Sequence, residues 1–230
     1  MRITICIPTY EMNGDGVDFL EYSFKILESQ TFRDFNVVIS DHSVNNEISD
    51  LTIKYNKTLD IKYIRNTVKR GSSSANINNA MKYADGQYIK ILFQDDFLYG
   101  NNSLQIINDN LEPLTKWLIS SCTHTYDTKN YFNYMTPLYH NNIHLGVNTI
   151  SSPSVLTILN ENPLFFDENL NCLMDCDYYK ACFNKFGDPK ILNKTTVVNR
   201  CGIHQVSNTL VTRESTNKEL EYVKSKYKNG

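Results

Sequence analysis

The sequence has few features of a membrane or nucleic-acid-binding protein. Its apolar runs fall well short of the roughly 20 residues that a membrane-spanning helix needs. The net charge is −2, from 23 basic and 25 acidic residues, so bulk charge gives no support for binding nucleic acid. The opening segment, MRITICIPTY, is too short, and too soon interrupted by Pro8, to be the apolar region of a signal peptide. We therefore expect a cytoplasmic protein.

Several common site motifs are also missing. The six cysteines form no CxxC pair or compact framework, and the spacing of Cys172, Cys176 and Cys182 fits no zinc pattern, so reduced thiols suit the chain better. No GxGxxG follows the first apolar run and there is no Walker A motif. These absences argue against a dinucleotide oxidoreductase and a P-loop phosphotransferase.

In its first hundred residues the chain alternates regularly between predicted strands and predicted helices. With 41% hydrophobic residues over 230 positions, it can bury the core of one large domain. Four runs predict strands: Ile3–Ile7, Phe35–Ser40, Ile61–Ile64 and Tyr88–Phe93. Three segments between them have helical spacing: Phe19–Glu28, Glu47–Tyr55 and a stretch that includes Ala75, Ile77, Ala80 and Met81. Alternating strands and helices predict an α/β fold with a mostly parallel central sheet flanked by helices.

Acidic residues follow two of these strands. Asp95 and Asp96 end the strand Tyr88–Phe93, and Asp41 ends the strand Phe35–Ser40. Open α/β sheets bind ligands at the carboxyl ends of their strands. Two adjacent carboxylates repel each other unless a positive charge lies between them, so a hard divalent cation is the expected partner of Asp95 and Asp96.

The second half of the chain is less regular. The predicted elements are a helix from Ser103 to Leu111, a strand from Trp117 to Cys122, loops or short strands from Thr123 to His144, a segment from Gly146 to Leu159 that is strand-like around Pro153 and Ser154, a helix from Asp175 to Phe186 and a strand from Thr195 to Asn199. Residues 212–230 are highly charged and predict a surface helix or tail. A modest apolar stripe there (Leu220, Val223, Tyr227) leaves peripheral membrane contact open.

Taken in order, these features resemble family 2 glycosyltransferases, which are inverting enzymes with the GT-A nucleotide-sugar fold. The resemblance runs from about residue 3 to residue 208. Its segments are Ile5–Tyr10 (ICIPTY), Val38–Ser43 (VISDHS), Arg70–Ile89, Phe93–Asp96 (FQDD), Met174–Asp177 (MDCD) and Arg200–Ser207 (RCGIHQVS). Two positions depart from the family pattern: Phe93 stands where the DxD motif has its first Asp, and Met174 stands where a Glu is common.

The resemblance implies a domain organisation. We expect a single GT-A domain over residues 1–211, with a nucleotide-binding half (1–97) and an acceptor half (98–211), followed by the charged segment 212–230. A small second sheet is expected at the acceptor side.

The resemblance also implies an activity and its site residues. The reaction is transfer of a sugar, with inversion, from a nucleotide donor (UDP is favoured by Asp41) to a hydroxyl of a glycan or glycoconjugate. The expected nucleotide-binding residues are Pro8, Thr9, Tyr10, Asp41, Arg70, Asn76, Gln94 and Asp95. The expected metal ligands, for Mn²⁺ or Mg²⁺, are Asp95, Asp96 and His204. Asp175 is the expected general base for the acceptor hydroxyl.

Each assignment has a structural alternative. Asp175 at a helix start would serve as an N-cap, and Asp41 at a strand end as a turn residue. His204 and Arg70 would be structural or solvated, and Tyr10 would pack in the core. For the whole chain, the alternatives are a non-catalytic nucleotide-sugar-binding relative and a sugar nucleotidyltransferase. The second should carry a basic Gly-rich loop after the first strand, whereas Thr9–Gly16 contains no Lys or Arg.

Overall fold

The strands of the N-terminal half form a parallel block. In this computed structural model, which describes residues 1–205 and 212–228, the block has the order β3-β2-β1-β4. The strands are β1 (Ile3–Thr9), β2 (Phe35–Asp41), β3 (Ile61–Arg65) and β4 (Tyr88–Ile91). All three pairings are parallel. The β-rich runs of the sequence predicted these strands, and β1 and β2 are buried along their whole length.

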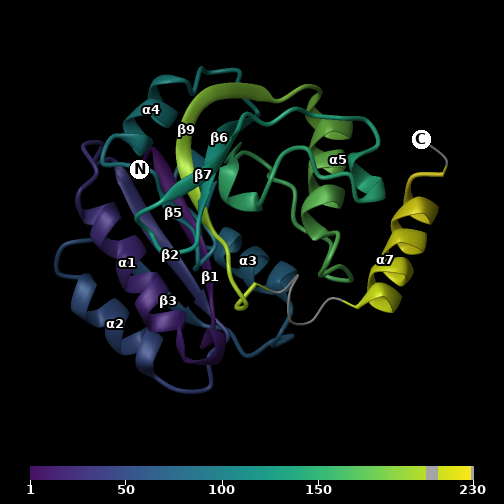
Figure 1. The fold of residues 1–230 in the computed structure, drawn as a ribbon. Helices are drawn as coiled ribbons and strands as arrows, with labels where there is room; N and C mark the ends of the chain where they lie inside the picture. Colours follow the sequence, from purple (N-terminus) through teal and green to yellow (C-terminus); the bar gives the residue numbers. More distant parts are fainter. Residues whose placement is uncertain (206–211, 229–230) are drawn as a thin grey trace.

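Helices cover both faces of this block (Figure 1). They are α1 (Gly16–Glu28), α2 (Glu47–Tyr55) and α3 (Ser73–Lys82). The chain moves outward from β1 to β3 through α1 and α2 and then returns to β4 through α3, so right-handed crossovers place α3 on the opposite face. Buried side chains at helical spacing, such as Leu20, Phe24 and Leu27 of α1, face the sheet.

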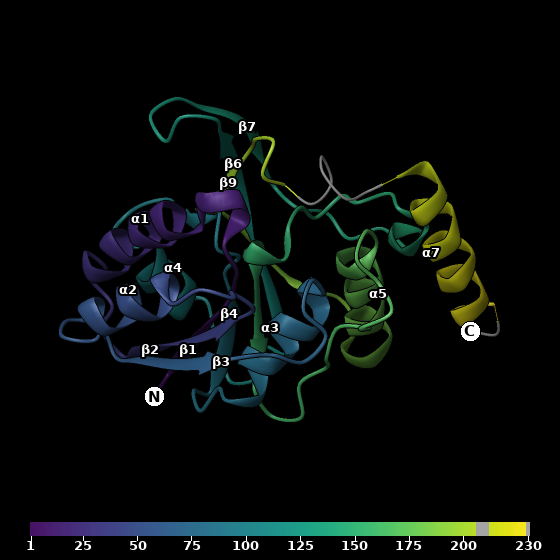
Figure 2. The ribbon, with the colours of Figure 1, turned by 90° about the horizontal axis from the view of Figure 1, so that it is seen from below.

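The C-terminal half extends the same sheet. Its strands are β5 (Phe97–Leu98), β6 (Trp117–Thr125), β7 (Tyr131–Met135), β8 (Leu156–Leu159) and β9 (Lys190–Arg200). The sheet continues from β4 as β8-β6-β9-β5, and β7 pairs with β6. The expected small second sheet is therefore wrong for the described part of the chain. Its strand, β7, is a hairpin extension of β6 in the main sheet, which Figure 2 shows projecting from the body.

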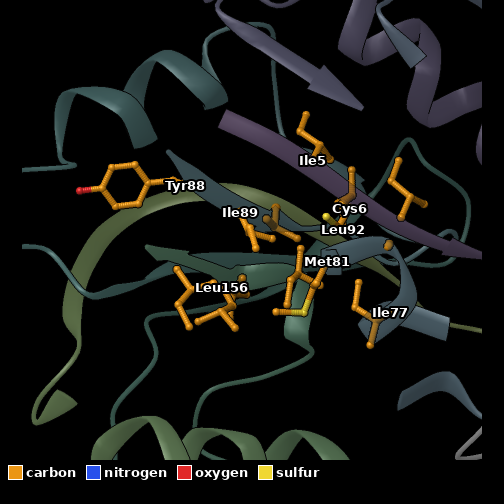
Figure 3. Close-up of a cluster of buried hydrophobic side chains, with 14 of the residues drawn as sticks. Ile5, Cys6, Ile77, Met81, Tyr88, Ile89, Leu92 and Leu156 are labelled. Atoms are coloured by element: carbon orange, nitrogen blue, oxygen red, sulfur yellow. The ribbon is translucent and has the colours of Figure 1, made fainter. Parts of the chain in front are cut away.

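The core spans the junction between the two halves. Figure 3 shows Cys6 and Ile89 of the parallel block near Met81 of α3, with Leu156 of β8 close to Ile89. These side chains belong to one buried cluster that also includes residues of the C-terminal half. Burial of this continuous cluster fixes the C-terminal strands against β4 and so fixes the loops at the strand ends.

The second half contains α4 (Ser103–Asp109) and α5 (Met174–Phe186), with short 3₁₀ helices η2 (Ile143–Leu145) and η3 (Pro153–Val155). Another 3₁₀ helix, η1 (Met12–Gly14), lies in the first half between β1 and α1. The segment from Gly146 to Leu159, predicted to be strand-like around Pro153 and Ser154, does contain a strand, Leu156–Leu159 (β8). The prediction is wrong at Pro153 and Ser154 themselves, which form η3. The fixed φ of proline and its missing N–H suit the first position of a helical turn.

The charged C-terminal segment forms helix α7 (Arg213–Lys226), which lies beside α5 (Figures 1 and 2). Thr212 and Ser215 begin it with a reciprocal capping box. Val223 is fully buried, and Leu220 and Tyr227 pack against the core. The apolar stripe that left membrane contact open therefore faces the protein. Among the described residues, no helix is long and apolar enough to cross a bilayer.

Candidate active site

A cavity of about 540 Å³ opens where β1 and β4 end. Most of the residues predicted for the site line it, and they come from both halves of the chain. They are Pro8, Tyr10, Arg70, Asn76, Gln94, Asp95, Asp96, Asp175 and His204. Thr9 and Asp41 are not among the lining residues and lie behind the wall, fully buried.

Asp41 is held in a closed hydrogen-bond network. One carboxylate oxygen accepts from the hydroxyl of Thr9 (3.2 Å) and the backbone N–H of Ser43 (2.9 Å). The other accepts from the hydroxyl of Tyr63 (2.7 Å) and lies 3.7 Å from Nε of Arg65. In this arrangement both oxygens have partners within the protein, so Asp41 and Thr9 brace the wall from behind.

The side-chain amides of Asn76 and Gln94 also form their hydrogen bonds within the cavity wall. Asn76 accepts from Ser40 Oγ (2.7 Å) and donates to the carbonyl of Thr9 (3.0 Å). Gln94 accepts from the N–H of Tyr10 (2.8 Å) and donates to the carbonyl of Gly16 (2.7 Å). A Cβ at Gly16 would lie 2.3 Å from the carbonyl oxygen of Tyr10, so this close approach requires glycine. The two amides fix the loop after β1 against β4 and α3.

Tyr10 and Arg70 are the more open members of the predicted nucleotide-binding set. Tyr10 is 36% exposed, and Arg70 is exposed, with a single long contact from Nη2 to the carbonyl of Ser43 (3.4 Å). Burial and the nearby Asp95 carboxylate raise the pKa of the Tyr10 hydroxyl, which keeps it a hydrogen-bond donor at neutral pH. These two side chains can turn to meet a ligand in the cavity.

Asp95 and His204 face each other across the cavity floor. Oδ2 of Asp95 lies 3.3 Å from Nε2 of His204, although the residues are far apart in the chain. Among the described residues, none makes a well-aligned hydrogen bond to this buried Nε2. The contact with the Asp95 carboxylate raises the pKa of His204. A Cβ on Gly202 would lie 2.7 Å from the imidazole of His204. The absence of a side chain at Gly202 therefore provides the space that the ring occupies.

Asp96 points away from this pair. Its oxygens accept from the backbone N–H of Arg200 (3.1 Å) and from Oγ of Ser152 (2.9 Å). Burial, reinforced by the charge of Asp95, raises the pKa of Asp96 to about 7. The two adjacent acids thus have different surroundings, and the expected role of Asp96 as a metal ligand is not favoured by the donors that already occupy its oxygens.

Two buried cations near these acids were not predicted. Lys90 is fully buried in β4, where its ammonium donates to the carbonyls of Ser154 and Leu156, and burial lowers its pKa to about 7. Arg200 donates from Nε to the carbonyl of Asp95 (3.0 Å), and its guanidinium lies 4.5 Å from the ring centre of Phe19. A lysine inside the apolar run YIKILF is a signal in the sequence, since buried lysines require partners. Arg200 gives no comparable local signal.

Asp175 lies on the opposite wall, in the first turn of α5. Its carboxylate accepts from the N–H of Cys176 (2.7 Å) and from Nδ2 of Asn148 (2.6 Å). Burial raises the pKa of Asp175 to about 6, although these hydrogen bonds act in the opposite direction. A carboxylate with a raised pKa that lines a cavity has the properties of a general base. Asn148 lies in a loop without periodicity, so the sequence did not identify it.

The donor set on the cavity floor fits a divalent cation. Two ligands placed at right angles about 2.1 Å from a metal ion are about 3 Å apart, close to the separation of Asp95 Oδ2 and His204 Nε2. A buried nitrogen without an aligned partner is also what a metal ligand presents in the absence of its ion. Within the described residues, no group of three or more His, Cys, Asp or Glu side chains is arranged for a metal. An ion held by Asp95 and His204 would therefore need further oxygens from a phosphate ligand and water, as Mg²⁺ sites commonly have.

The comparisons with known proteins identify the family. The family model described as glycosyl transferase family 2 matches residues 4–179, so the chain belongs to this family.

Two curated relatives transfer glucose. The chain is 26% identical, over 98 residues, to the GalNAc(5)-diNAcBac-PP-undecaprenol beta-1,3-glucosyltransferase of Campylobacter jejuni, covering 42% of this chain and 30% of the relative. It is 28% identical, over 115 residues, to the poly(ribitol-phosphate) beta-glucosyltransferase of Bacillus spizizenii, covering 49% of this chain and 18% of the relative. Each match thus spans less than a third of the relative.

Solved structures confirm the predicted GT-A fold. Residues 1–349 of S. aureus TarS, in complex with UDP-GlcNAc, superpose with a TM-score of 0.75 at 19% identity, covering 100% of this chain and 67% of that one. The mannosyltransferase PcManGT of Pyrobaculum calidifontis, in complex with GDP-Man and Mn²⁺, superposes with a TM-score of 0.59 at 18% identity, covering 88% of this chain and 57% of that one.

Proposed function

We propose that this glycosyltransferase is an inverting enzyme that transfers a sugar from a UDP-sugar to a hydroxyl of a glycan or glycoconjugate. The observation that carries the proposal is that a single cavity has a possible metal-binding pair on one side and a possible general base on the other. Asp95 and His204 form a pair suited to a divalent cation, and Asp175 on the other wall has the raised pKa of a base. A leaving-group side and a base side in one cavity suit a single displacement, which inverts the anomeric carbon.

The donor side binds the nucleotide diphosphate. Mn²⁺ or Mg²⁺ bound by Asp95 and His204 would offset the negative charge that develops on the leaving diphosphate. Arg70 supplies a positive charge at the cavity rim, and Tyr10 supplies a ring and a hydroxyl beside Pro8. Asp96, Asn76, Gln94, Thr9 and Asp41 hold the wall in shape through the hydrogen bonds described above.

The acceptor side activates the hydroxyl. Asp175 in its ionised form takes the proton of the acceptor hydroxyl as that oxygen attacks the sugar. The N–H of Cys176 and the amide of Asn148 orient the carboxylate, one at each oxygen, and a lone pair on each oxygen remains to take the proton. The domain organisation that this division supports is a donor half over residues 1–97 and an acceptor half over residues 98–211, followed by α7.

The relatives guide the choice of donor to test. TarS is described with UDP-GlcNAc, and both curated relatives are glucosyltransferases. UDP-glucose and UDP-GlcNAc are therefore the first donors to try, and a surface glycopolymer or a lipid-linked glycan is the acceptor class that the relatives' names favour.

Calorimetric titration of UDP, with and without Mn²⁺, tests the donor side. We expect UDP binding that needs the metal in the wild-type protein and is lost in Asp95→Ala. Asp109→Ala is the matched control, because Asp109 lies at the end of α4, outside the cavity lining. Absence of UDP binding in the wild type under both conditions would overturn the nucleotide assignment, and GDP would then be titrated in its place.

A further inference from the structure

The C-terminal helix reaches the base side of the cavity through one carboxylate. Glu219, in the middle of α7, accepts hydrogen bonds from three consecutive backbone N–H groups. These belong to Asn171 (3.0 Å), Cys172 (2.9 Å) and Leu173 (2.9 Å). Three convergent N–H donors hold a carboxylate strongly, since charge-assisted hydrogen bonds are about twice as strong as neutral ones.

The bonded segment is the entry to α5, which carries the proposed base. Leu173 occupies the N-cap position of α5 and has no side-chain group to cap the first N–H groups. Glu219 of α7 accepts from the N–H of this N-cap residue and of the two residues before it, next to the positive end of the α5 dipole. Asn171, Cys172 and Asp175 all line the cavity, so the segment that Glu219 holds is part of the acceptor-side wall.

A second set of contacts fixes the far end of α7. Lys226 lies 2.8 Å from a carboxylate oxygen of Asp177 and 2.9 Å from one of Asp167. The hydroxyl of Tyr227 donates to the other oxygen of Asp177 (2.9 Å). Because α7 is anchored at this end independently, loss of the Glu219 carboxylate alone should leave the helix docked while freeing the entry to α5.

We propose that Glu219 is a positioning residue for the transfer reaction, and that α7 is a clamp that holds Asn171–Leu173 and thereby the carboxylate of Asp175. This inference rests on the proposed function, because it assigns Glu219 to the base side of that site. The donor side, built from residues 1–97 and the loop of His204, makes no contact with Glu219 among those described for its carboxylate. Glu219 should therefore affect turnover and leave UDP binding unchanged.

The test is Glu219→Ala, assayed by UDP release from UDP-glucose or UDP-GlcNAc, whichever the wild type uses, and by calorimetric titration of UDP with Mn²⁺. We expect kcat to fall about tenfold, because small misplacement of a catalytic group is costly, with the UDP affinity unchanged. Glu221→Ala is the matched control. It removes the same charge from the same helix, where Glu221 is exposed and pairs with Lys224. This control should keep the wild-type kcat.

Glu219→Gln refines the test and replaces the alanine variant if that variant does not fold. Its amide oxygen can still accept from two of the N–H groups, so its kcat should lie between those of the wild type and Glu219→Ala. Amide hydrogen exchange at Cys172 and Leu173 should be faster in both variants.

Two outcomes separate the proposals. Wild-type kcat in folded Glu219 variants that bind UDP, with only a lowered melting temperature, would overturn the clamp and leave the proposed function intact. Lack of UDP binding by the wild type would overturn the proposed function itself.

Discussion

The two walls of the cavity are held in different ways. On the donor wall, polar side chains bond to one another and to nearby backbone within the parallel block, as Asn76 does with Ser40 and Thr9. On the acceptor wall, Asp175 depends on groups from distant segments, namely Asn148 directly and Glu219 of α7 through the entry to α5.

From this difference we expect nucleotide binding and sugar transfer to respond differently to mutation. A wall whose polar groups are mutually satisfied is rigid before any ligand arrives, which lowers the entropy cost of binding a nucleotide. A base supported by several separate segments is sensitive to changes far from it. Substitutions on one wall should therefore change either UDP affinity or kcat without changing the other.

The largest expected effect is on transfer. Asp175→Asn removes the proton acceptor but keeps the shape of the side chain, so kcat should fall about 1000-fold while UDP affinity stays unchanged. Steady-state kinetics and calorimetric titration of UDP measure the two quantities. Asp109→Asn is the control, since Asp109 lies at the end of α4, outside the cavity lining. An active Asp175→Asn enzyme would exclude Asp175 as the base.

A smaller effect is expected on the stability of the donor wall. Asn76→Ala removes the acceptor of the buried Ser40 hydroxyl and one of the two N–H donors to the Thr9 carbonyl, which should cost about 2 kcal/mol of unfolding free energy. Chemical denaturation measures this loss, and well below the melting temperature UDP affinity should change little. A large loss of UDP affinity in a variant of wild-type stability would instead make Asn76 a direct nucleotide ligand.

The smallest expected effect is on pH dependence. Because the pKa of Asp175 is raised to about 6, and the ionised form accepts the proton, kcat/KM should rise as pH increases through 6. At pH 5, one unit below this pKa, about a tenth of the carboxyls are ionised, so activity should be about tenfold lower than at pH 7. The pH profile should be measured at saturating Mn²⁺. An acid limb centred near pH 4 would show a base with an ordinary pKa.

Sequence pattern predicted the donor half well. Helix α2 has the predicted bounds, Glu47–Tyr55, and the parallel strands begin at the predicted residues. These elements are governed by short-range periodicity, which a single sequence carries. The family model confirms the resemblance to the family. Of the eleven site residues that the resemblance predicted, nine line the cavity.

What could not be predicted depends on contacts between distant residues. The closed network around Asp41 needs Tyr63 and Arg65 of the neighbouring strand, and the support of α5 needs Glu219, which lies 46 residues beyond Leu173. The segment around Pro153 was predicted as a strand because its neighbours are β-rich, whereas the proline itself favours a turn. The sequence predicted both Asp95 and Asp96 as metal ligands, and it gave no sign of the Ser152 and Arg200 donors that hold Asp96 in the fold.

The position of β9 has a consequence for how the protein is made. This strand lies between β6 and β5, and it ends at Arg200, whose N–H binds the Asp96 carboxylate 104 residues earlier. Until the nascent chain has emerged as far as residue 200, β6 and β5 lack the strand that pairs with both of them, and Asp96 lacks the N–H of Arg200. The ribosome must therefore release the chain through residue 200 before this part of the site closes, and a premature stop before β9 removes an interior strand of the sheet.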